Sequence, residues 1–243
     1  PRRGFALAMA ATILMMAAAS APSLFYPQIA EQLGLVPVAT TLVFAVYTFT
    51  LLAALLYLGP LSDYIGRRPV VTAGSLALAL SLAMFWFAGG LATLLVARAL
   101  QGLAAGLLIP ALSAMMIDFE PPSHPNIAAL WNTIGPMIGL GTGALGAALL
   151  LDLTPEPTAA VFGLLVLAFL IVAATVWITP ELVPKTRLRR GDLRPRFTVP
   201  PHLRRMFTAG VPVIIAGWAT NGLFLALGAD LVGSELGGST HTQ

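Results

Sequence analysis

Seven long apolar runs separated by short polar segments constrain this 243-residue chain more than any other feature. A helix needs about 20 mostly apolar residues to cross ~30 Å of hydrocarbon, and every run is close to that length or longer. The runs are continuously apolar rather than alternating, which favours membrane helices over a membrane β-barrel. The predicted spans are Phe5–Tyr26, Thr40–Leu58, Val70–Ala88, Leu91–Ile117, Ile127–Leu151, Thr158–Ile178 and Met206–Leu231.

Composition supports a polytopic membrane protein in contact with the lipid bilayer. The chain is 58% hydrophobic and 9% charged, whereas soluble domains carry about 25% charged residues. Cysteine is absent and the three histidines lie outside the runs, so we expect no metal site, no cofactor and no enzymatic activity. Retinal proteins are excluded because the single lysine, Lys185, also lies outside the apolar runs.

Lysine and arginine predict how the chain is oriented. Arg2 and Arg3 precede the first run, Arg67 and Arg68 follow the second, and most other cations lie in residues 185–205, after the sixth. With seven spans, these groups share one side, which the positive-inside rule makes cytoplasmic. We therefore expect a plasma- or inner-membrane protein with a cytoplasmic N-terminus. That arrangement excludes seven-helix receptors and explains the basic charge without a nucleic-acid partner.

A charged hinge, G-P-L-S-D-Y-I-G-R-R-P, joins the second run to the third. It supplies the candidate gating loop, formed by Gly59, Asp63, Gly66, Arg67 and Arg68. The carboxylate and the guanidinium groups can pair at the membrane surface, and the glycines permit a tight turn. In the alternative interpretation, the arginines only set topology and Asp63 is a helix-end charge.

This hinge resembles the G-x-L-x-D-x-x-G-R-R-P loop between the second and third helices of major facilitator superfamily transporters. The resemblance implies an all-α integral membrane fold, with a six-helix bundle of two inverted three-helix repeats plus one helix of a truncated second bundle. It assigns the first bundle to residues 1–179, a cytoplasmic central loop to 180–205, and the seventh helix to 206–243. It also implies that the gating loop contacts the missing C-terminal bundle of the same protein and holds the cytoplasmic gate shut.

The fourth run contains an arginine that is costly to place in a membrane. Arg98 is followed by Gln101 and Gly102 on the same helical face. A buried arginine usually faces a bundle interior or cavity, although Arg98 is near enough to the outer end of the run to snorkel. The set resembles the superfamily's R-x-x-Q-G pattern, which is associated there with proton coupling.

The fifth run contains a glycine at every fourth position, namely Gly135, Gly139 and Gly143, together with Pro136. Such spacing gives a smooth face that a neighbouring helix can approach closely, and proline removes one backbone hydrogen bond. The run partly resembles the G-P-x-x-G-G motif of drug/proton antiporters, with Leu140 in place of the last glycine. Ordinary packing through small residues is the alternative.

Few polar groups remain for a transport path. Ser20, Ser23, Asn132 and Asn221 lie inside predicted spans and are the candidates for lining a cavity. No acidic residue is clearly at mid-membrane, so the candidates for the protonated group are Asp63, Asp118 or an acid in the missing bundle.

The predicted function is secondary active transport by alternating access between two bundles. We expect proton-coupled efflux of a hydrophobic or amphipathic small molecule, with the proton gradient as the energy source. Two alternatives stay open: a proton-coupled nutrient importer and a half-transporter fragment without transport of its own.

Overall fold

The computed structural model describes the backbone of residues 2–25, 29, 31, 33–34, 37–183, 204–213, 215–217 and 219–220. The chain divides into two compact units, Pro1–Arg194 and Pro195–Gln243, and each is described by itself.

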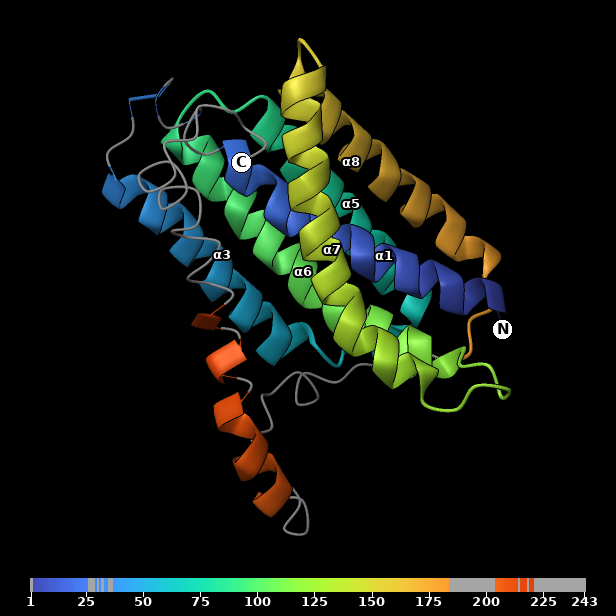
Figure 1. Cartoon of the computed structure of the whole chain (residues 1–243). Helices are drawn as coiled ribbons and strands as arrows, with labels where there is room; N and C mark the ends of the chain where they lie inside the picture. The colour runs from blue at the N-terminus through green and yellow to red at the C-terminus, as the bar shows by residue number, and fades with distance from the viewer. Residues whose placement is uncertain are drawn as a thin grey trace. The chain divides into compact units, whose positions relative to one another are not determined.

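The first unit is helical, and no strand occurs among the residues that the structure describes (Figure 1). Its elements are α1 (Arg2–Ser20), η1 (Ala21–Phe25), α3 (Pro37–Leu58), α4 (Leu61–Ile65), α5 (Arg67–Trp86), α6 (Leu91–Asp118), α7 (Ile127–Leu153), α8 (Pro157–Thr175) and η2 (Val176–Ile178). Six helices of this described part are long and apolar enough to cross a membrane. They match the first six predicted runs, which confirms the predicted all-α membrane fold.

The structure differs from the predicted spans at several ends. Helix α3 begins at Pro37, three residues before the predicted start at Thr40. The third helix begins at Arg67, three residues before the predicted start at Val70, so both arginines of the gating loop lie in its first turn. The first α-helix ends at Ser20 and continues to Phe25 as a 3₁₀ helix, in which Pro22 lies. Proline lacks the N–H that an α-helix uses, which accounts for the change of helix type.

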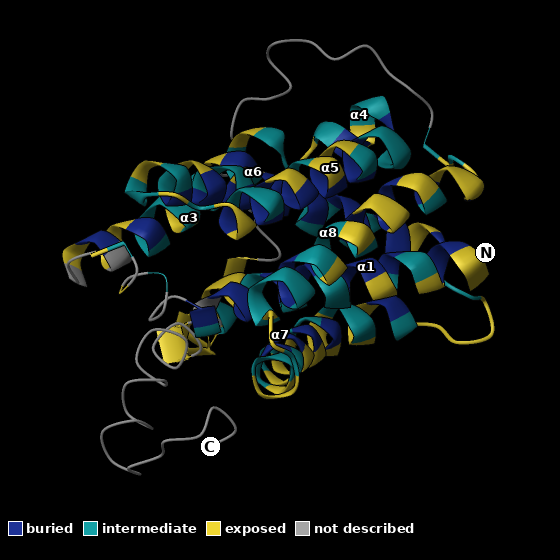
Figure 2. Cartoon of the chain, turned by 90° about the horizontal axis from the view of Figure 1, so that it is seen from above, coloured by how far each residue is buried: buried dark blue, intermediate teal, exposed yellow. Residues whose placement is uncertain are grey.

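Helix α6 lies at the centre of the first unit. It packs most extensively against α3 and α5, while α1 packs against α7, and α5 also contacts α8. Aromatic rings pack together where η1 and α5 end and α8 begins. The centroid of the Phe162 ring of α8 lies 5.4 Å from that of Phe25 and 6.1 Å from that of Phe85. Figure 2 shows the resulting burial, with dark blue faces turned inward on α1, α5 and α6.

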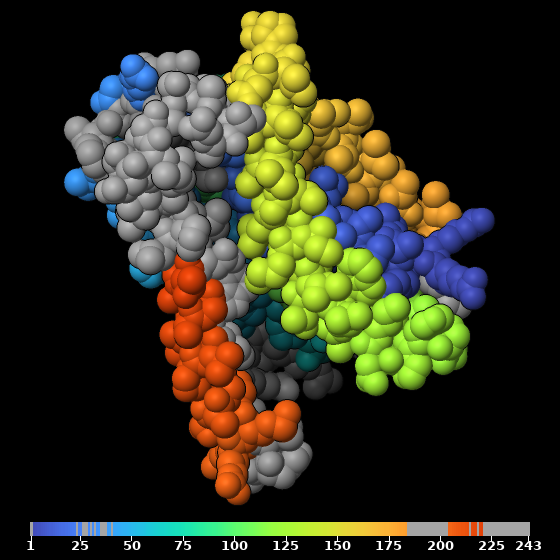
Figure 3. All heavy atoms as spheres, viewed as in Figure 1, coloured from blue at the N-terminus to red at the C-terminus, as the bar shows by residue number. Residues whose placement is uncertain are grey.

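Helices α3 and α7 are the least buried spans. Within an apolar 18-residue stretch of each helix, only 11% and 17% of the residues are buried in α3 and α7, compared with at least 50% in α1, α5 and α6. The side chains of α7 form an uncovered ridge along one face of the first unit (Figure 3). Large apolar side chains such as Met137 and Leu145 are more than half exposed on this ridge. The faces of α3 and α7 therefore require lipid or another apolar surface.

The second unit contributes a helical stretch at the start of the predicted seventh run. Residues 204–213, 215–217 and 219–220 are helical, and the described side chains there are mostly exposed. The rest of the run lies outside the described residues, as do Asn221 and Asp230 and nearly all of the predicted central loop.

Candidate functional site: a charge network beside the gating loop and a buried arginine

Arg67 is the hub of a charge network at the end of the bundle where α5 begins. Its guanidinium donates from Nη1 to Asp63 Oδ1 at 2.5 Å and to Ser62 Oγ at 2.7 Å. Its Nε donates to Asp118 Oδ2 at 2.9 Å, at the last residue of α6. We call these four residues the Arg67 network. The planar guanidinium supplies donors in a fixed fork, so one side chain connects α4, α5 and α6.

Exposure varies within this network. The side chain of Arg67 is 11% exposed and that of Asp118 is 26% exposed, whereas Asp63 is 60% exposed. Water screens an exposed ion pair, so the Asp63 pair contributes little to stability and the Asp118 pair contributes more. The Asp63 carboxylate is therefore accessible to a further partner.

A second carboxylate binds the backbone of the same helix end. Glu181, which follows η2, accepts hydrogen bonds from the Arg67 N–H at 3.1 Å and the Arg68 N–H at 3.0 Å. The first N–H groups of a helix have no partner within the helix, and the helix dipole favours a negative charge there. Glu181 thus fixes the residues after the sixth span to the start of the third.

Gly66 makes this contact possible. Its φ of +100° lies in a region that other residues rarely adopt. A Cβ atom at this position would lie 2.6 Å from the Glu181 Oε2 atom. Glycine is required both for the turn from α4 into α5 and for the approach of the carboxylate.

Arg68 has a different environment from Arg67. Among the described residues its guanidinium makes no ion pair, and its buried Nε has no hydrogen-bond partner there. The structure therefore places Asp63 and Arg67 in the Arg67 network and Gly66 beside it. Arg68 contributes only its backbone N–H, which donates to Glu181. Gly59 lies before α4. A Cβ atom at this position would lie 2.5 Å from the Leu55 carbonyl oxygen.

Arg98 is buried in the interior of the first unit. It is 2% exposed, and its Cζ lies 5.3 Å, 5.5 Å and 5.2 Å from the ring centroids of Phe44, Tyr47 and Phe85. The faces of aromatic rings attract a guanidinium, which compensates part of the lost hydration. Arg98 therefore faces helices α3 and α5, and the snorkelling alternative does not describe it.

Gln101 connects Arg98 to another helix. Its Oε1 accepts a hydrogen bond from Arg98 Nη1 at 2.5 Å, and its Nε2 donates to the Ala18 carbonyl oxygen of α1 at 2.9 Å. Gly102 faces α3, where a Cβ would lie 2.5 Å from the Tyr47 carbonyl oxygen. The three residues of the motif thus lie at the junction of α1, α3, α5 and α6.

The glycines of α7 face α1. A Cβ at Gly139 would lie 2.4 Å from the Ile13 carbonyl oxygen, and one at Gly143 would lie 2.5 Å from Ala17 Cα. Gly135 is looser, with no neighbour nearer than 3.9 Å. Ser20 strengthens the seam by donating to the Leu140 carbonyl oxygen at 2.9 Å. Helix α7 continues through Pro136 to Leu153, and the half-buried Asn132 lies near its start.

Acidic side chains occur only near helix ends and in loops in the part of the chain that the structure describes. Asp63 and Asp118 belong to the Arg67 network, and Asp152 lies at the other end of the bundle. No group of three or more metal-ligating side chains occurs within the described ranges.

Sequence reasoning missed several residues of both sites. It did not assign Glu181 or Ser62 to a site, and it did not predict that aromatic rings surround Arg98. The sequence does contain a signal for Glu181. This acid comes directly after the sixth span, on the side of the membrane where the third span begins after Gly66. The aromatic residues Phe44, Tyr47 and Phe85 carry no such signal, since they occur in runs that are apolar throughout.

Comparison with known proteins identifies the class to which this architecture belongs. The sequence model of the Major Facilitator Superfamily matches residues 8–237 of the chain. The chain is therefore a member of the Major Facilitator Superfamily, a family of membrane transporters.

Curated relatives include proteins named for drug resistance and efflux. The multidrug resistance protein MdtL of Shewanella oneidensis is 32% identical over 150 residues, covering 58% of this chain and 37% of MdtL. The multidrug efflux pump LfrA of Mycolicibacterium smegmatis is 31% identical over 204 residues, covering 79% of this chain and 36% of LfrA. The puromycin resistance protein pur8 of Streptomyces alboniger is 29% identical over 152 residues, covering 60% of this chain and 30% of pur8. The matched parts amount to about a third of these relatives' length.

Proposed function

We propose that the chain is the first bundle, with the start of the second, of a transporter that exports hydrophobic or amphipathic small molecules in exchange for protons. The names of the matched relatives, which refer to resistance and efflux, support the direction of transport. The uncovered apolar faces of α3 and α7 support a second bundle as the missing partner, because both faces need an apolar surface beside them.

The Arg67 network is the observation that supports a gating role best. It joins three helices at one end of the bundle while leaving the Asp63 carboxylate 60% exposed, as a contact for a helix of the second bundle would require. Arginines at this end and at the first turn of α1 support a cytoplasmic location for the network. In the proposed cycle, the network forms when the cytoplasmic side is closed and loosens when the two bundles rock apart.

Arg98 has a separate place in this proposal. Its proposed role depends on its positive charge, and it is not proposed as the proton carrier. Its position beside α1, held through Gln101 and the Ala18 carbonyl, supports an effect on a carboxylic acid of the transport path. A nearby cation favours the ionised form of a carboxyl group, so Arg98 would favour proton release from an acid of the second bundle that approaches it during the cycle.

The test is efflux of a fluorescent lipophilic cation from cells that express the complete protein. We expect export that stops when an uncoupler collapses the proton gradient. Accumulation of substrate instead of export would support the importer alternative. Export by the complete protein but not by the 243-residue chain expressed alone would support the fragment alternative for this chain.

A further inference from the structure

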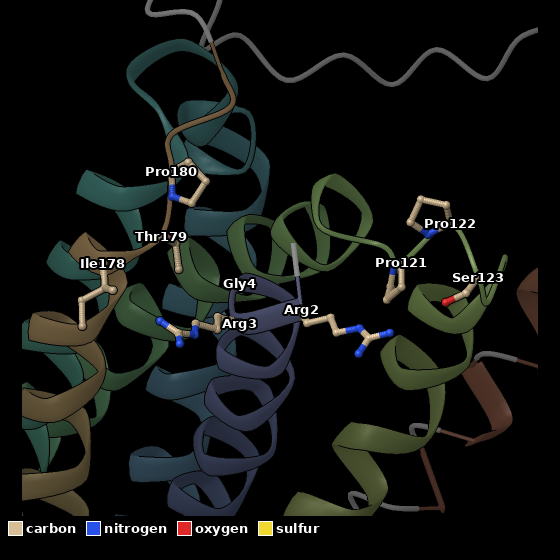
Figure 4. Close-up of a pocket in the computed structure, with 9 residues that line it drawn as sticks. All are labelled: Arg2, Arg3, Gly4, Pro121, Pro122, Ser123, Ile178, Thr179 and Pro180. Carbon is tan, nitrogen blue, oxygen red and sulfur yellow. The ribbon is translucent and has the colours of Figure 1, made fainter.

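An open cavity of about 660 Å³ lies at the end of the bundle where α1 begins. Figure 4 shows its walls, which come from the first turn of α1, the loop between α6 and α7, and the residues after α8. The lining residues are Arg2, Arg3, Gly4, Pro121, Pro122, Ser123, Ile178, Thr179 and Pro180. None of them belongs to the Arg67 network or to the surroundings of Arg98.

The walls are mostly apolar, apart from the two arginines, Ser123 and Thr179. Pro121, Pro122 and Pro180 supply rings and have no backbone N–H to donate. Gly4 lets the start of α1 lie directly against the Phe119 ring, where a Cβ would come within 2.6 Å of the ring carbons. This packing fixes the first turn of α1, and with it both arginines, in the wall of the cavity.

The arginines of this cavity form no ion pair with the described acids that adjoin it. Two carboxylates adjoin its walls in sequence, but both are engaged elsewhere: Glu120 accepts from the Ala128 N–H, and Glu181 accepts from the start of α5. Among the described residues, Arg2 and Arg3 take part in no salt bridge. Figure 4 shows Arg2 extending toward Pro121 and Ser123, and Arg3 extending toward Ile178 and Thr179.

We propose that this cavity binds headgroups of anionic phospholipids, with Arg2 and Arg3 contacting phosphate on opposite sides of the first turn of α1 and the prolines and Ile178 beside the glycerol backbone. Guanidinium groups bind phosphate oxygens through charge-assisted hydrogen bonds. The arginines lie in the first turn of a membrane span, so they are at the depth of lipid headgroups. Basic pockets between membrane helices bind such headgroups, and the cavity volume is within the range of small-ligand sites.

The experiment is thermal unfolding of the purified full chain in a neutral detergent, with phosphatidylglycerol, phosphatidylethanolamine or inorganic phosphate added. We expect phosphatidylglycerol to raise the Tm by several degrees and the two other additions to leave it nearly unchanged. Stabilisation follows because a ligand that binds only the folded state shifts the unfolding equilibrium.

Matched variants assign the effect to the cavity. Arg2→Gln/Arg3→Gln should lose most of the shift, whereas Arg2→Lys/Arg3→Lys keeps both charges and should retain most of it. Ser123→Trp, which fills the cavity without removing charge, should also reduce the shift and serves if the glutamine variant does not fold. Equal shifts in the wild type and the glutamine variant would overturn the proposal. Equal shifts with phosphatidylethanolamine would overturn the role of charge, and a full shift with inorganic phosphate would overturn the lipid assignment.

Discussion

The Glu181 carboxylate accepts a hydrogen bond from the backbone N–H of Arg67, a residue 114 positions earlier in the chain. This contact joins the end of the sixth span to the start of the third, beside the guanidinium that binds Asp63 and Asp118. The residues that lead into the central loop are thereby fixed to the gating loop itself.

Removal of the Glu181 carboxylate should destabilise the first unit. In Glu181→Ala, the partly buried N–H groups of Arg67 and Arg68 lose their acceptor, and the loss of a side chain that caps a helix start costs about 0.5–2 kcal/mol. Thermal unfolding in detergent measures the effect as a lower Tm. Leu182→Ala is the control, because this neighbouring side chain is 52% exposed. Equal melting temperatures for the two variants would contradict the assigned contact.

Gly66→Ala should destabilise the protein through the same contact. The added Cβ requires an unfavourable φ and meets the Glu181 carboxylate at 2.6 Å, and such backbone strain costs on the order of 1–3 kcal/mol. Glu181→Ala in the same chain should relieve part of the penalty, so the two changes should be less than additive. Gly90→Ala is the control, since no atom lies within 4 Å of its Cβ position. If the destabilising effects of the two changes were fully additive, the Glu181 carboxylate would not contribute to the penalty of Gly66→Ala.

Asp63→Asn in the complete protein should reduce transport while leaving insertion and stability nearly unchanged. The carboxylate is 60% exposed, so its pairing with Arg67 contributes less than about 1 kcal/mol to stability. A gating role depends instead on its charge at the surface where a second bundle would bind. Efflux rate and Tm, measured on the same preparation, separate the two effects. Asp152→Asn, at the opposite end of the bundle, is the control, and unchanged efflux in Asp63→Asn would refute the gating role.

Arg98→Met should remove transport more completely than it lowers stability. Methionine keeps an apolar stem among Phe44, Tyr47 and Phe85, and replacing a buried charge by an apolar side chain of similar length is often neutral for stability. Proton-driven efflux, by contrast, should be lost if the fixed charge acts on a protonated group. The measurement is efflux at several imposed proton gradients, compared with the Tm. Normal efflux in Arg98→Met would restrict this residue to a packing role.

Gly143→Ala should weaken the seam between α1 and α7. Its Cβ would lie 2.5 Å from Ala17 Cα, and overpacking of this kind costs about 1–3 kcal/mol. Gly141→Ala, two residues earlier on the same helix, should leave stability unchanged or raise it, because its Cβ position is open. Thermal unfolding of the two variants in parallel separates the effect of the Ala17 contact from that of helix propensity, which the two substitutions share. Equal melting temperatures would show that α7 shifts away from α1 to accommodate the added methyl group.

The sequence alone determined the membrane class, the positions of six spans and the family resemblance. These follow from local properties, because each span must satisfy its own backbone hydrogen bonds and present apolar side chains along its whole length. The gating loop was also recognisable, since its turn requires glycine at Gly66 and its charges are adjacent in sequence. The predicted roles of these residues in gating and proton coupling stay predictions.

The tertiary structure decided which side chains meet. The glycine spacing of the fifth run marked a packing face but not the helix that packs there, which is α1. The apolar runs that supply the rings around Arg98 carry no pattern that tells their packed side from their lipid-facing side. Glu181 reaches Arg67 only because the sixth span ends at the side of the bundle where the third span, α5, begins, and because η2 lies next to α5. Composition and hydropathy act on each span separately, whereas these contacts depend on how the spans pack against one another.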